Sequence, residues 1–426
     1  MKKTMIARAL PFALVTLASG QAAASGFQLL EQNASGLGNA YAGSAAVADN
    51  ASTIFFNPAG MTQLQAREVS AGINAIRPTY KFTDQGSSVG ALAGTGTGND
   101  AGAWAFVPNA YLSWALDKDL YVGVGISVPF GLVTEYDKPW LGAAQAVKFD
   151  IKTININPSI AYRVNEKVSL GFGLNWQRME AEYTRVAAVS NAATTGTNVT
   201  LDASDDSMGW NIGALFTLSE RTTLGISYRS KMKHTLTGDI RVDGTLAGFN
   251  AALTTGAAKA DVELPDTVIF SVAQQLNDRW EMLGDVSWTG WSSIQKIHIV
   301  RTSGTLINQT VQTLDADFRD TWRIALGANY KLDDAWKLKF GVAYDQTPVT
   351  GPGTRLVSLP DSNRTWLTAG AQWQVSPAST VDMGVAYLHV PETTINNNQA
   401  ASGRGTVTGT YDARVWILGA QYSMAF

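Results

Sequence analysis

Side chains that could act in catalysis are few in this chain, and their surroundings do not support a reaction. Residues 86–90 read Gly-Ser-Ser-Val-Gly, which matches the G-x-S-x-G pattern of a nucleophile elbow. Such a serine needs a strand before it and a helix after it. Here the pattern lies in a Ser/Gly-rich stretch without helical periodicity. We interpret it as loop composition and expect a protein that is not an enzyme.

Metal ligands are also sparse. The chain has no cysteine, which leaves histidine and carboxylate as possible ligands. Three histidines stand far apart and are expected at the rim of the fold: His234, His298 and His389. Asp202, Asp205 and Asp206 could contact Ca²⁺, but the run lacks the glycine and glutamate positions of a calcium loop, so a solvated turn is favoured. We expect neither a metal nor a cofactor.

Binding of an amphipathic acid is the chemistry that the basic residues fit best. Residues 169–185 alternate between two faces, and Leu170 and Trp176 share the face expected to contact lipid. The opposite face carries Met179, Tyr183 and Arg185. The same alternation points Arg319 and Arg323 inward. A cation beside apolar side chains suits a carboxylate on a hydrocarbon chain, although these arginines could instead line water or pair with neighbouring acids.

The segments after residue 65 predict the scaffold that positions these residues. Six short polar turns separate strand-like segments: 117–119, 165–166, 219–221, 277–279, 333–334 and 376–378. Seven longer Gly/Ser/Thr/Asn-rich connections separate the others: 80–103, 131–146, 187–203, 239–257, 298–312, 346–362 and 395–405. This arrangement requires 14 strands with both chain ends on the short-turn side. Even strand numbers, short turns on one side and long loops on the other are typical of outer-membrane barrels.

Side-chain alternation supports closure of these strands into a barrel. In the last segment Trp416, Leu418 and Tyr422 share one face, while Gly419 lies on the other. Soluble sandwiches alternate too, but aromatic residues at strand ends and the terminal Phe426 favour a membrane barrel. An open sheet of this size would expose its edges, and closure removes them. The predicted fold class is all-β, a 14-stranded antiparallel transmembrane β-barrel with a small N-terminal plug in its lumen.

The first 24 residues read as a secretion signal, with Lys2, Lys3 and Arg8 before an apolar run over 9–18 and small residues at 22–24. No later stretch reaches the 18 or so apolar residues of a membrane helix. The lack of cysteine excludes a lipoprotein anchor and disulfides. Without the signal the chain has 29 basic and 35 acidic residues, so we expect no nucleic-acid partner.

The stretch after the signal does not read as a strand, because glycines interrupt any period of two. Asn57 followed by Pro58 and Ala59 predicts an N-cap and the first residue of a helical turn. The stretch carries more apolar surface than short turns can bury alone: Phe27, Leu29, Leu30, Ile54, Phe55, Phe56 and Met61. A barrel lumen would enclose it. The expected division is a signal over 1–24, a plug over 25–64 and a barrel over 65–426.

These residues resemble the outer-membrane transporters of the FadL type, which carry long-chain fatty acids and other hydrophobic compounds. The resemblance rests on SGFQL, SGLGNAYAG, AVADNAS and NPAG in the plug and on FGLVTEY, FGVAYDQTP and LPDSNRTWL in the barrel. It implies that Phe27 contacts the ligand and that the Asn57-Pro58-Ala59 motif positions the plug. It also implies that Arg185 is one of two basic residues that hold the ligand carboxylate.

The resemblance further implies an opening in the barrel wall. Gly131 and Val133 would lie beside an inward kink of the third strand, opposite Asp345, where cargo leaves toward lipid. Alternation points all three residues inward. Pro129 in the same strand fits a wall defect, because proline cannot donate to a ladder.

We therefore expect passive uptake of hydrophobic molecules through a Gram-negative outer membrane, with long-chain fatty acids as the first choice and monoaromatic hydrocarbons as the second. The apolar plug disfavours a general porin. No motif identifies the second carboxylate-binding residue, so Arg319 and Arg323 are candidates from alternation alone. The expected ligand contacts are Phe27, Leu29, Phe55, Phe56, Met179, Arg185, Arg319 and Arg323. The expected partners are the cargo and outer-membrane lipid, with the barrel as a monomer.

Overall fold

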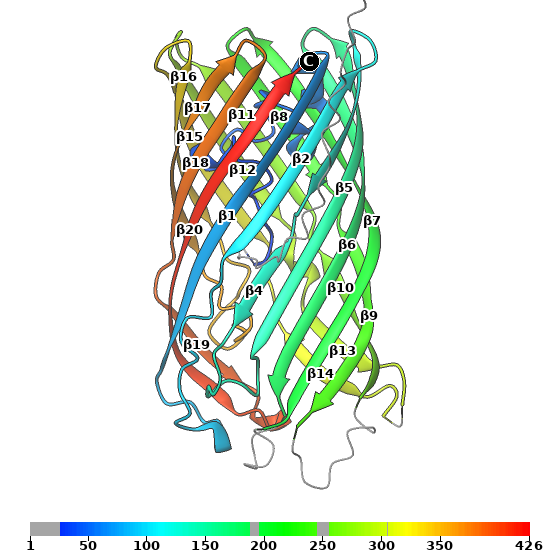
Figure 1. Cartoon of the computed structure of the whole chain (residues 1–426), viewed down its shortest axis with the longest axis vertical. Helices are drawn as coiled ribbons and strands as arrows, with labels where there is room; N and C mark the ends of the chain where they lie inside the picture. The colour runs from blue at the N-terminus through cyan, green and yellow to red at the C-terminus, as the bar shows by residue number, and fades with distance from the viewer. Residues whose placement is uncertain (1–25, 188–195, 245–254, 305) are drawn as a thin grey trace, which may run out of the picture.

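The computed structural model describes residues 26–187, 196–244, 255–304 and 306–426. The predicted signal over 1–24 lies outside the described residues. Strands wind around the N-terminal segment, which lies inside the end of the barrel that carries the C-terminus (Figure 1). Among the described residues, no helix has the length and apolar character to cross a membrane.

Within the described ranges, the wall consists of 20 strand segments in one sheet. Their bounds are β1 (Arg67–Asp84), β2 (Ala105–Ala115), β3 (Leu120–Ser127), β4 (Gly131–Glu135), β5 (Lys148–Asn165), β6 (Val168–Val186), β7 (Asn198–Ser219), β8 (Thr222–Arg229), β9 (Met232–Asp243), β10 (Gly256–Leu264), β11 (Thr267–Gln275), β12 (Trp280–Thr289), β13 (Lys296–Arg301), β14 (Thr310–Asp315), β15 (Thr321–Lys331), β16 (Trp336–Asp345), β17 (Arg364–Ser376), β18 (Ser379–His389), β19 (Thr393–Asn398) and β20 (Thr406–Ala425). Neighbours pair antiparallel, and β20 pairs with β1 along its whole length, which closes the ring.

The 20 segments form 14 strands, because some strands are broken into two collinear segments. Both segments of a broken strand pair with the same neighbouring strand, as β3 and β4 do with β5. The broken strands are β3/β4, β8/β9, β10/β11, β12/β13, β14/β15 and β18/β19. The predicted fold class is confirmed. The predicted wall defect at Pro129 lies in the β3/β4 break. The other breaks were not predicted, although Pro265 and Pro391 each lie in one, where a residue without an N–H cannot extend the ladder.

The plug, residues 26–64, is a series of turns with three short helices, η1 (Leu37–Asn39), α1 (Thr53–Phe56) and η2 (Pro58–Gln63). Asn57 caps η2 as predicted, since its side chain accepts a hydrogen bond from the Ala59 N–H at 3.1 Å and Pro58 follows it. Among the residues that the structure describes, three further short helices lie in connections: η3 (Gly90–Leu92), η5 (Trp291–Ser293) and η6 (Ala400–Ser402).

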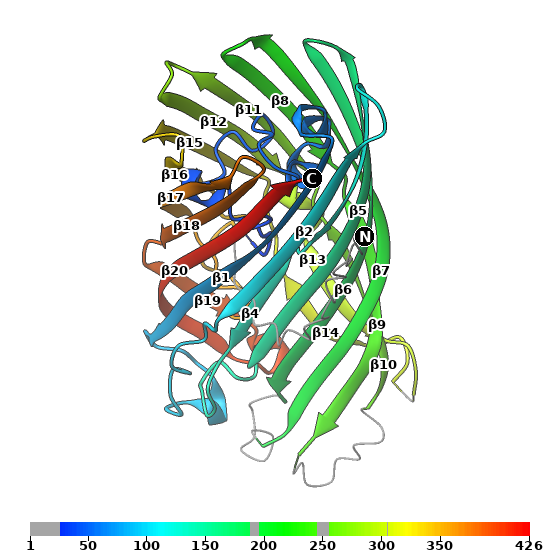
Figure 2. The ribbon, with the colours of Figure 1, turned by 45° about the horizontal axis from the view of Figure 1, so that its top comes forward.

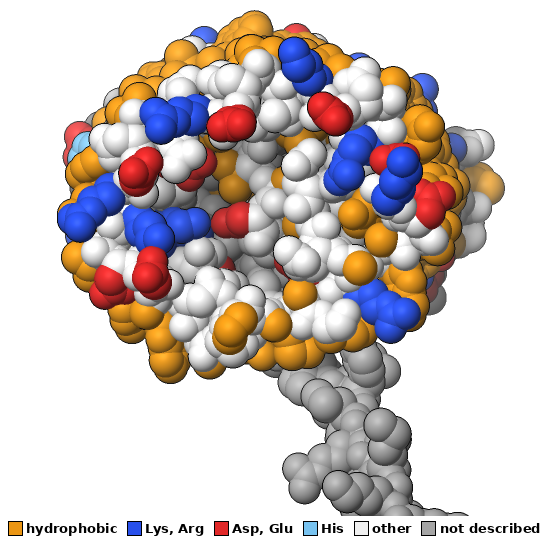
Figure 3. Space-filling view, turned by 90° about the horizontal axis from the view of Figure 1, so that it is seen from above, with side chains coloured by type: hydrophobic (Ala, Val, Ile, Leu, Met, Phe, Trp, Pro, Cys, Tyr) orange, Lys and Arg blue, Asp and Glu red, His pale blue; other side chains and the backbone are white. Residues whose placement is uncertain are grey.

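The outer face of the barrel is apolar, as a membrane barrel requires. Exposed aromatic and aliphatic side chains follow one another on alternate positions, as in Leu170, Phe172, Leu174 and Trp176 of β6. Seen from the short-turn end, apolar side chains lie around the perimeter and charged ones around the rim of a central hollow (Figure 3). The tilted strands extend well past the plug toward the long connections (Figure 2).

Candidate functional site

The Asn57-Pro58-Ala59 motif fastens the plug to the wall. The Asn57 side chain donates to the carbonyl oxygens of Ala45 at 2.7 Å and Ala214 of β7 at 3.0 Å. The wall meets the motif with glycines: a Cβ on Gly171 would lie 2.3 Å from the Ala59 nitrogen, and one on Gly213 would lie 2.0 Å from Asn57 Oδ1. Only glycine allows this approach.

The first described residues of the plug are hydrogen-bonded to the wall at the β3/β4 break. Leu29 donates to the Pro129 carbonyl at 2.8 Å, and the Gly131 N–H donates to the Phe27 carbonyl at 2.9 Å. Four rings pack around this segment and form what we call the aromatic partition: Phe27, Phe130, Trp291 and Phe318. The centroids of Phe27 and Trp291 are 5.0 Å apart. The partition lies between two cavities of the interior.

The apolar cavity lies on the long-connection side of the partition and spans about 650 Å³, a volume that includes space open to solvent. Met179 of β6 and Phe27 of the plug both line it. Other lining residues come from six further strands and from the β16–β17 connection: Phe149, Ile151, Leu201, Leu236, Val262, Ile299, Leu314, Leu356 and Leu359. Two of the expected ligand contacts are thus brought together here, in surroundings suited to a hydrocarbon.

Two buried arginines lie near Tyr183, behind the lining of the apolar cavity. Arg185 is buried beside Tyr183, which lines the cavity, and donates to the Val186 carbonyl at 2.9 Å. Arg404, in the β19–β20 connection, is equally buried and donates to the Val311 carbonyl at 3.0 Å. The two guanidiniums are close enough to repel each other, and both interact with Tyr183. No carboxylate within the described ranges forms an ion pair with either one.

Sequence reasoning missed Arg404 as the partner of Arg185. Neither candidate from alternation takes this place near Tyr183. Arg319 is exposed and donates to the Thr347 and Pro348 carbonyls, because the break at 316–320 turns Phe318 instead into the apolar cavity. The predicted lumenal position of Arg319 is therefore wrong.

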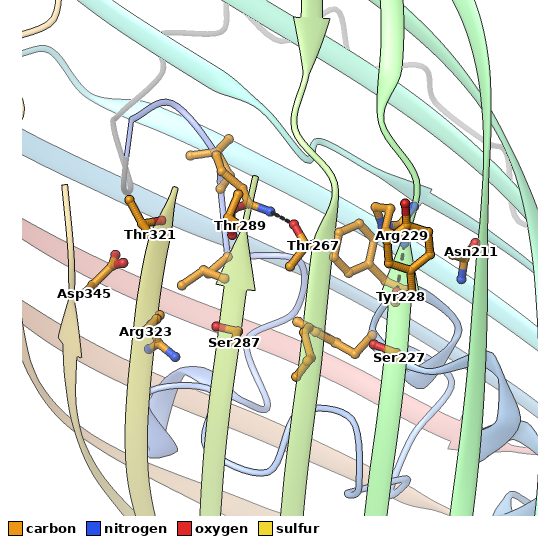
Figure 4. Close-up of a pocket in the computed structure, with 16 residues that line it drawn as sticks. Asn211, Ser227, Tyr228, Arg229, Thr267, Ser287, Thr289, Thr321, Arg323 and Asp345 are labelled. Carbon is orange, nitrogen blue, oxygen red and sulfur yellow. Dashed lines mark hydrogen bonds between the residues drawn. The ribbon is translucent and has the colours of Figure 1, made fainter. Parts of the chain in front are cut away.

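Arg323 lines the second cavity, which we call the plug–wall cavity (Figure 4). It spans about 720 Å³, a volume that includes space open to solvent. Leu29, Phe55 and Phe56 line it from the plug. Arg323 donates to the Ala40 carbonyl at 2.6 Å, and Asp345 lies beside it on β16. The expected ligand contacts thus fall into two groups on opposite sides of the partition.

The wall near Pro129 has a gap in its ladder. Pairing between β2 and β3 ends at Ala110 and Ile126, and the next backbone hydrogen bond joins the Glu135 N–H to the Ala101 carbonyl at 3.0 Å. Between these points, residues 102–109 and 127–134, all of them described, share no backbone hydrogen bond.

The predicted inward direction of Gly131 and Val133 is wrong. Ser127 of β3 pairs with Asn155, but Gly131 of β4 pairs with Lys152, so the register shifts by one residue across the break. A shift of one residue exchanges the two faces of a strand. Val133 therefore shares a face with Asp150, whereas its neighbour Leu132 shares the face of Ile151 and the apolar cavity. Asp345 lies in the plug–wall cavity.

The histidine and aspartate predictions also change. His234 is buried rather than at the rim, and its Nδ1 lies 3.1 Å from Asp205 Oδ2. The aspartates lie on β7, not in a solvated turn: Asp202 forms an ion pair with Arg241, and Asp206 with Arg178. In the described part of the chain, no group of three or more His, Asp or Glu residues has the geometry of a metal site.

Buried Glu31, in the plug, should make the stability of the protein depend on pH. Its side chain is 2% exposed and Oε2 has no hydrogen-bond partner. Burial raises the pKa of the Glu31 carboxyl from 4.5 to about 7, partly offset by Arg364 and Arg323. The folded protein therefore holds this proton more tightly than the unfolded chain does. The contribution of the neutral carboxyl to the free energy of unfolding is fully present below pH 4.5 and is lost as the pH rises through about 7.

Replacing Glu31 with glutamine should therefore remove up to about 3 kcal/mol of pH-dependent destabilisation. We expect Glu31→Gln to gain stability relative to the parent protein at pH 8 and to match it at pH 4. Denaturant unfolding midpoints of both proteins in the same detergent would measure this. Parallel pH profiles of the two proteins would contradict it.

Comparison with known proteins agrees with the fold and the plug. The chain matches the family described as "Outer membrane protein transport protein (OMPP1/FadL/TodX)" over residues 15–426. It is 29% identical, over the full length of both chains, to the long-chain fatty acid transport protein of Escherichia coli. A solved Pseudomonas aeruginosa FadL homologue superposes with a TM-score of 0.86 at 24% identity, covering 94% of this chain and 99% of its own.

The Ralstonia pickettii toluene transporter TbuX shares the fold more distantly, with a TM-score of 0.68, 18% identity and coverage of 93% of this chain and 100% of its own. The family match spans nearly the whole chain, and it agrees with the closed barrel and its internal plug. The chain therefore belongs to the OMPP1/FadL/TodX family of outer membrane transport proteins, which makes it an outer-membrane transporter and not an enzyme.

Proposed function

We propose that this transporter carries long-chain fatty acids from the cell exterior into the outer membrane, with the apolar cavity as the main binding site. The observation that carries the proposal is the pair of buried arginines near Tyr183, Arg185 and Arg404, with which no carboxylate of the described residues forms an ion pair. A buried cation without a counter-ion is costly, so a ligand that brings a carboxylate is favoured there.

The rest of the ligand would lie along apolar side chains. Each buried methylene contributes about 0.8 kcal/mol, so ten methylenes contribute about 8 kcal/mol. Met179 and Phe27 lie on this path. The E. coli relative is named as a long-chain fatty acid transport protein, which supports the same cargo.

Monoaromatic hydrocarbons are the second candidate. The lining of the apolar cavity is almost entirely hydrocarbon, and the aromatic partition offers ring faces to a flat ligand. The Ralstonia neighbour is named as a toluene transporter. Uptake of oleate and of toluene by cells with and without the protein decides between the two, because an aromatic channel would leave oleate uptake unchanged.

Removal of the Arg185 side chain should affect the binding of the two candidate cargoes differently. We expect Arg185→Ala to weaken oleate binding by about 1.5–3 kcal/mol, the range for a charge-assisted hydrogen bond, and to leave toluene binding unchanged. Equilibrium binding to the purified barrel would measure both. The matched control is Arg319→Ala, which removes an exposed arginine outside the cavity. Equal losses for both ligands, or none for either, would contradict the proposed carboxylate site.

We also infer that the barrel works as a monomer in contact with outer-membrane lipid. The apolar outer face supports lipid contact around the whole ring, and each barrel has its own plug and cavities. Mass measurement of the purified protein in detergent tests the monomer, and a stable dimer would contradict it.

A further inference from the structure

Apart from Ile269, the wall of the plug–wall cavity is polar along two rows, each of which crosses five neighbouring strands. The first row is Asn211, Arg229, Thr267, Thr289 and Thr321, joined by cross-strand pairing from β7 to β15. The second row is Ser227, Ile269, Ser287, Arg323 and Asp345, from β8 to β16. All ten line the cavity, and Figure 4 shows the labelled members side by side on the strands. The wall therefore offers hydroxyls and charges over its whole width.

The opposite side of the same cavity is apolar and comes from the plug. It consists of Leu29, Leu30, Phe55 and Phe56. Gln28 is the polar exception, and its Nε2 donates to Thr267 Oγ1 at 3.1 Å. A space with one polar and one apolar side suits a molecule that has both, and it suits a pure hydrocarbon poorly.

The two arginines of this cavity differ in their surroundings. Arg323 has Asp345 beside it, and the next strand adds the Arg364–Asp361 ion pair. The contacts of Arg229 are neutral groups. It donates to the Phe55 carbonyl at 2.8 Å and to Asn175 Oδ1, and its guanidinium lies 4.2 Å from the centroid of the Phe55 ring. Among the described residues, no carboxylate forms an ion pair with Arg229. Its charge is therefore available to an anion.

We propose that the plug–wall cavity is a second binding site for an amphipathic monocarboxylate, with Arg229 contacting the carboxylate and the apolar plug side contacting the chain. The inference rests on the proposed cargo and adds a step to its path. The ligand would leave Arg185 and Arg404, pass the aromatic partition, and find a second cation beyond it. Such a pair of sites spares the head group an uncompensated stay in the low-dielectric interior.

Native mass spectrometry of the intact barrel with oleate tests this, because it counts bound ligands. We expect the unmodified protein to bind two oleates and Arg185→Ala to retain one. Arg229→Gln should weaken one binding event roughly 10- to 100-fold, the range expected for a lost charge-assisted contact. Arg229→Lys should restore it. Oleyl alcohol, which has no charge, should bind equally to the Arg229→Gln and unmodified proteins.

A cavity-filling variant tests the same site without removing Arg229, and a conductance measurement checks that the plug stays in place. Ser287→Phe occupies the cavity and leaves Arg229 in place, so it should also reduce the count to one. Ion conductance of each variant, unchanged from the parent, would show that the plug is still seated. Binding of two oleates by both Arg229→Gln and Ser287→Phe would overturn the inference. A maximum of one oleate, lost in Arg185→Ala, would overturn it while the proposed function stands; no oleate bound at all would overturn both.

Discussion

Deletion of residues 27–61 is expected to turn the closed barrel into a water-filled pore, with small-ion conductance rising on the order of tenfold or more. The wall behind the plug is polar and would fill with water. Asp285 accepts a hydrogen bond from Ser44 Oγ at 2.8 Å, and Lys339 donates to the Ser35 carbonyl at 2.9 Å. Without the plug, these charged groups would face an open lumen.

Planar-bilayer recordings of the deleted and intact barrels would measure the change. A graded variant is Gly171→Leu, because a Cβ there would lie 2.3 Å from the Ala59 nitrogen and must push the plug motif away. Its matched control is Gly353→Leu, since nothing lies within 4 Å of a Cβ at that position. If the deleted barrel inserts but conducts no better than the intact one, the plug does not close the lumen.

Local signals were enough to predict the strand number and the plug cap. Each short turn, such as 117–119, is polar by itself, and each strand needs only its own alternation to be recognised. The cap at Asn57 depends on two residues that follow it directly. These features need no knowledge of the rest of the fold.

The prediction of side-chain direction was wrong where a strand is broken. Alternation assigns each side chain to the inner or outer face by counting residues along an unbroken strand. A one-residue shift at a break moves all the following side chains to the opposite face. Pro129 signalled one break, but the sequence gives no proline at 316–320, where Asp317 adopts a φ of 48°. Gly131, Val133 and Arg319 were misplaced for this reason.

Arg404 could not be predicted from the local sequence, for a different reason. Arg404 lies in a long connection without periodicity, and it comes near Arg185 only because the β19–β20 connection hydrogen-bonds to Gln145 and Val311, which are far away in the sequence. A lone arginine in a Gly/Ser-rich loop resembles many solvated arginines. Long-range folding, not residue type, makes it a candidate ligand.

Gly131→Arg and Val133→Phe are expected to abolish oleate uptake while the barrel still assembles and still binds oleate. We propose that cargo leaves through the gap between residues 102–109 and 127–134, where the ladder is missing. Both substituted positions lie on the face of β4 turned away from the apolar cavity. A larger side chain there would fill the gap and leave the binding cavity intact.

Energetics favour this route over an axial one. Release into water would cost about 8 kcal/mol for ten methylenes, whereas the gap leads to the hydrocarbon layer, where the exposed Phe106 and Ile126 flank it. Uptake and binding should be measured on the same preparations. The matched control is Val124→Phe, a lipid-facing position on the intact ladder of β3, which should transport normally. Near-normal uptake by Gly131→Arg and Val133→Phe would instead support axial transit past the plug.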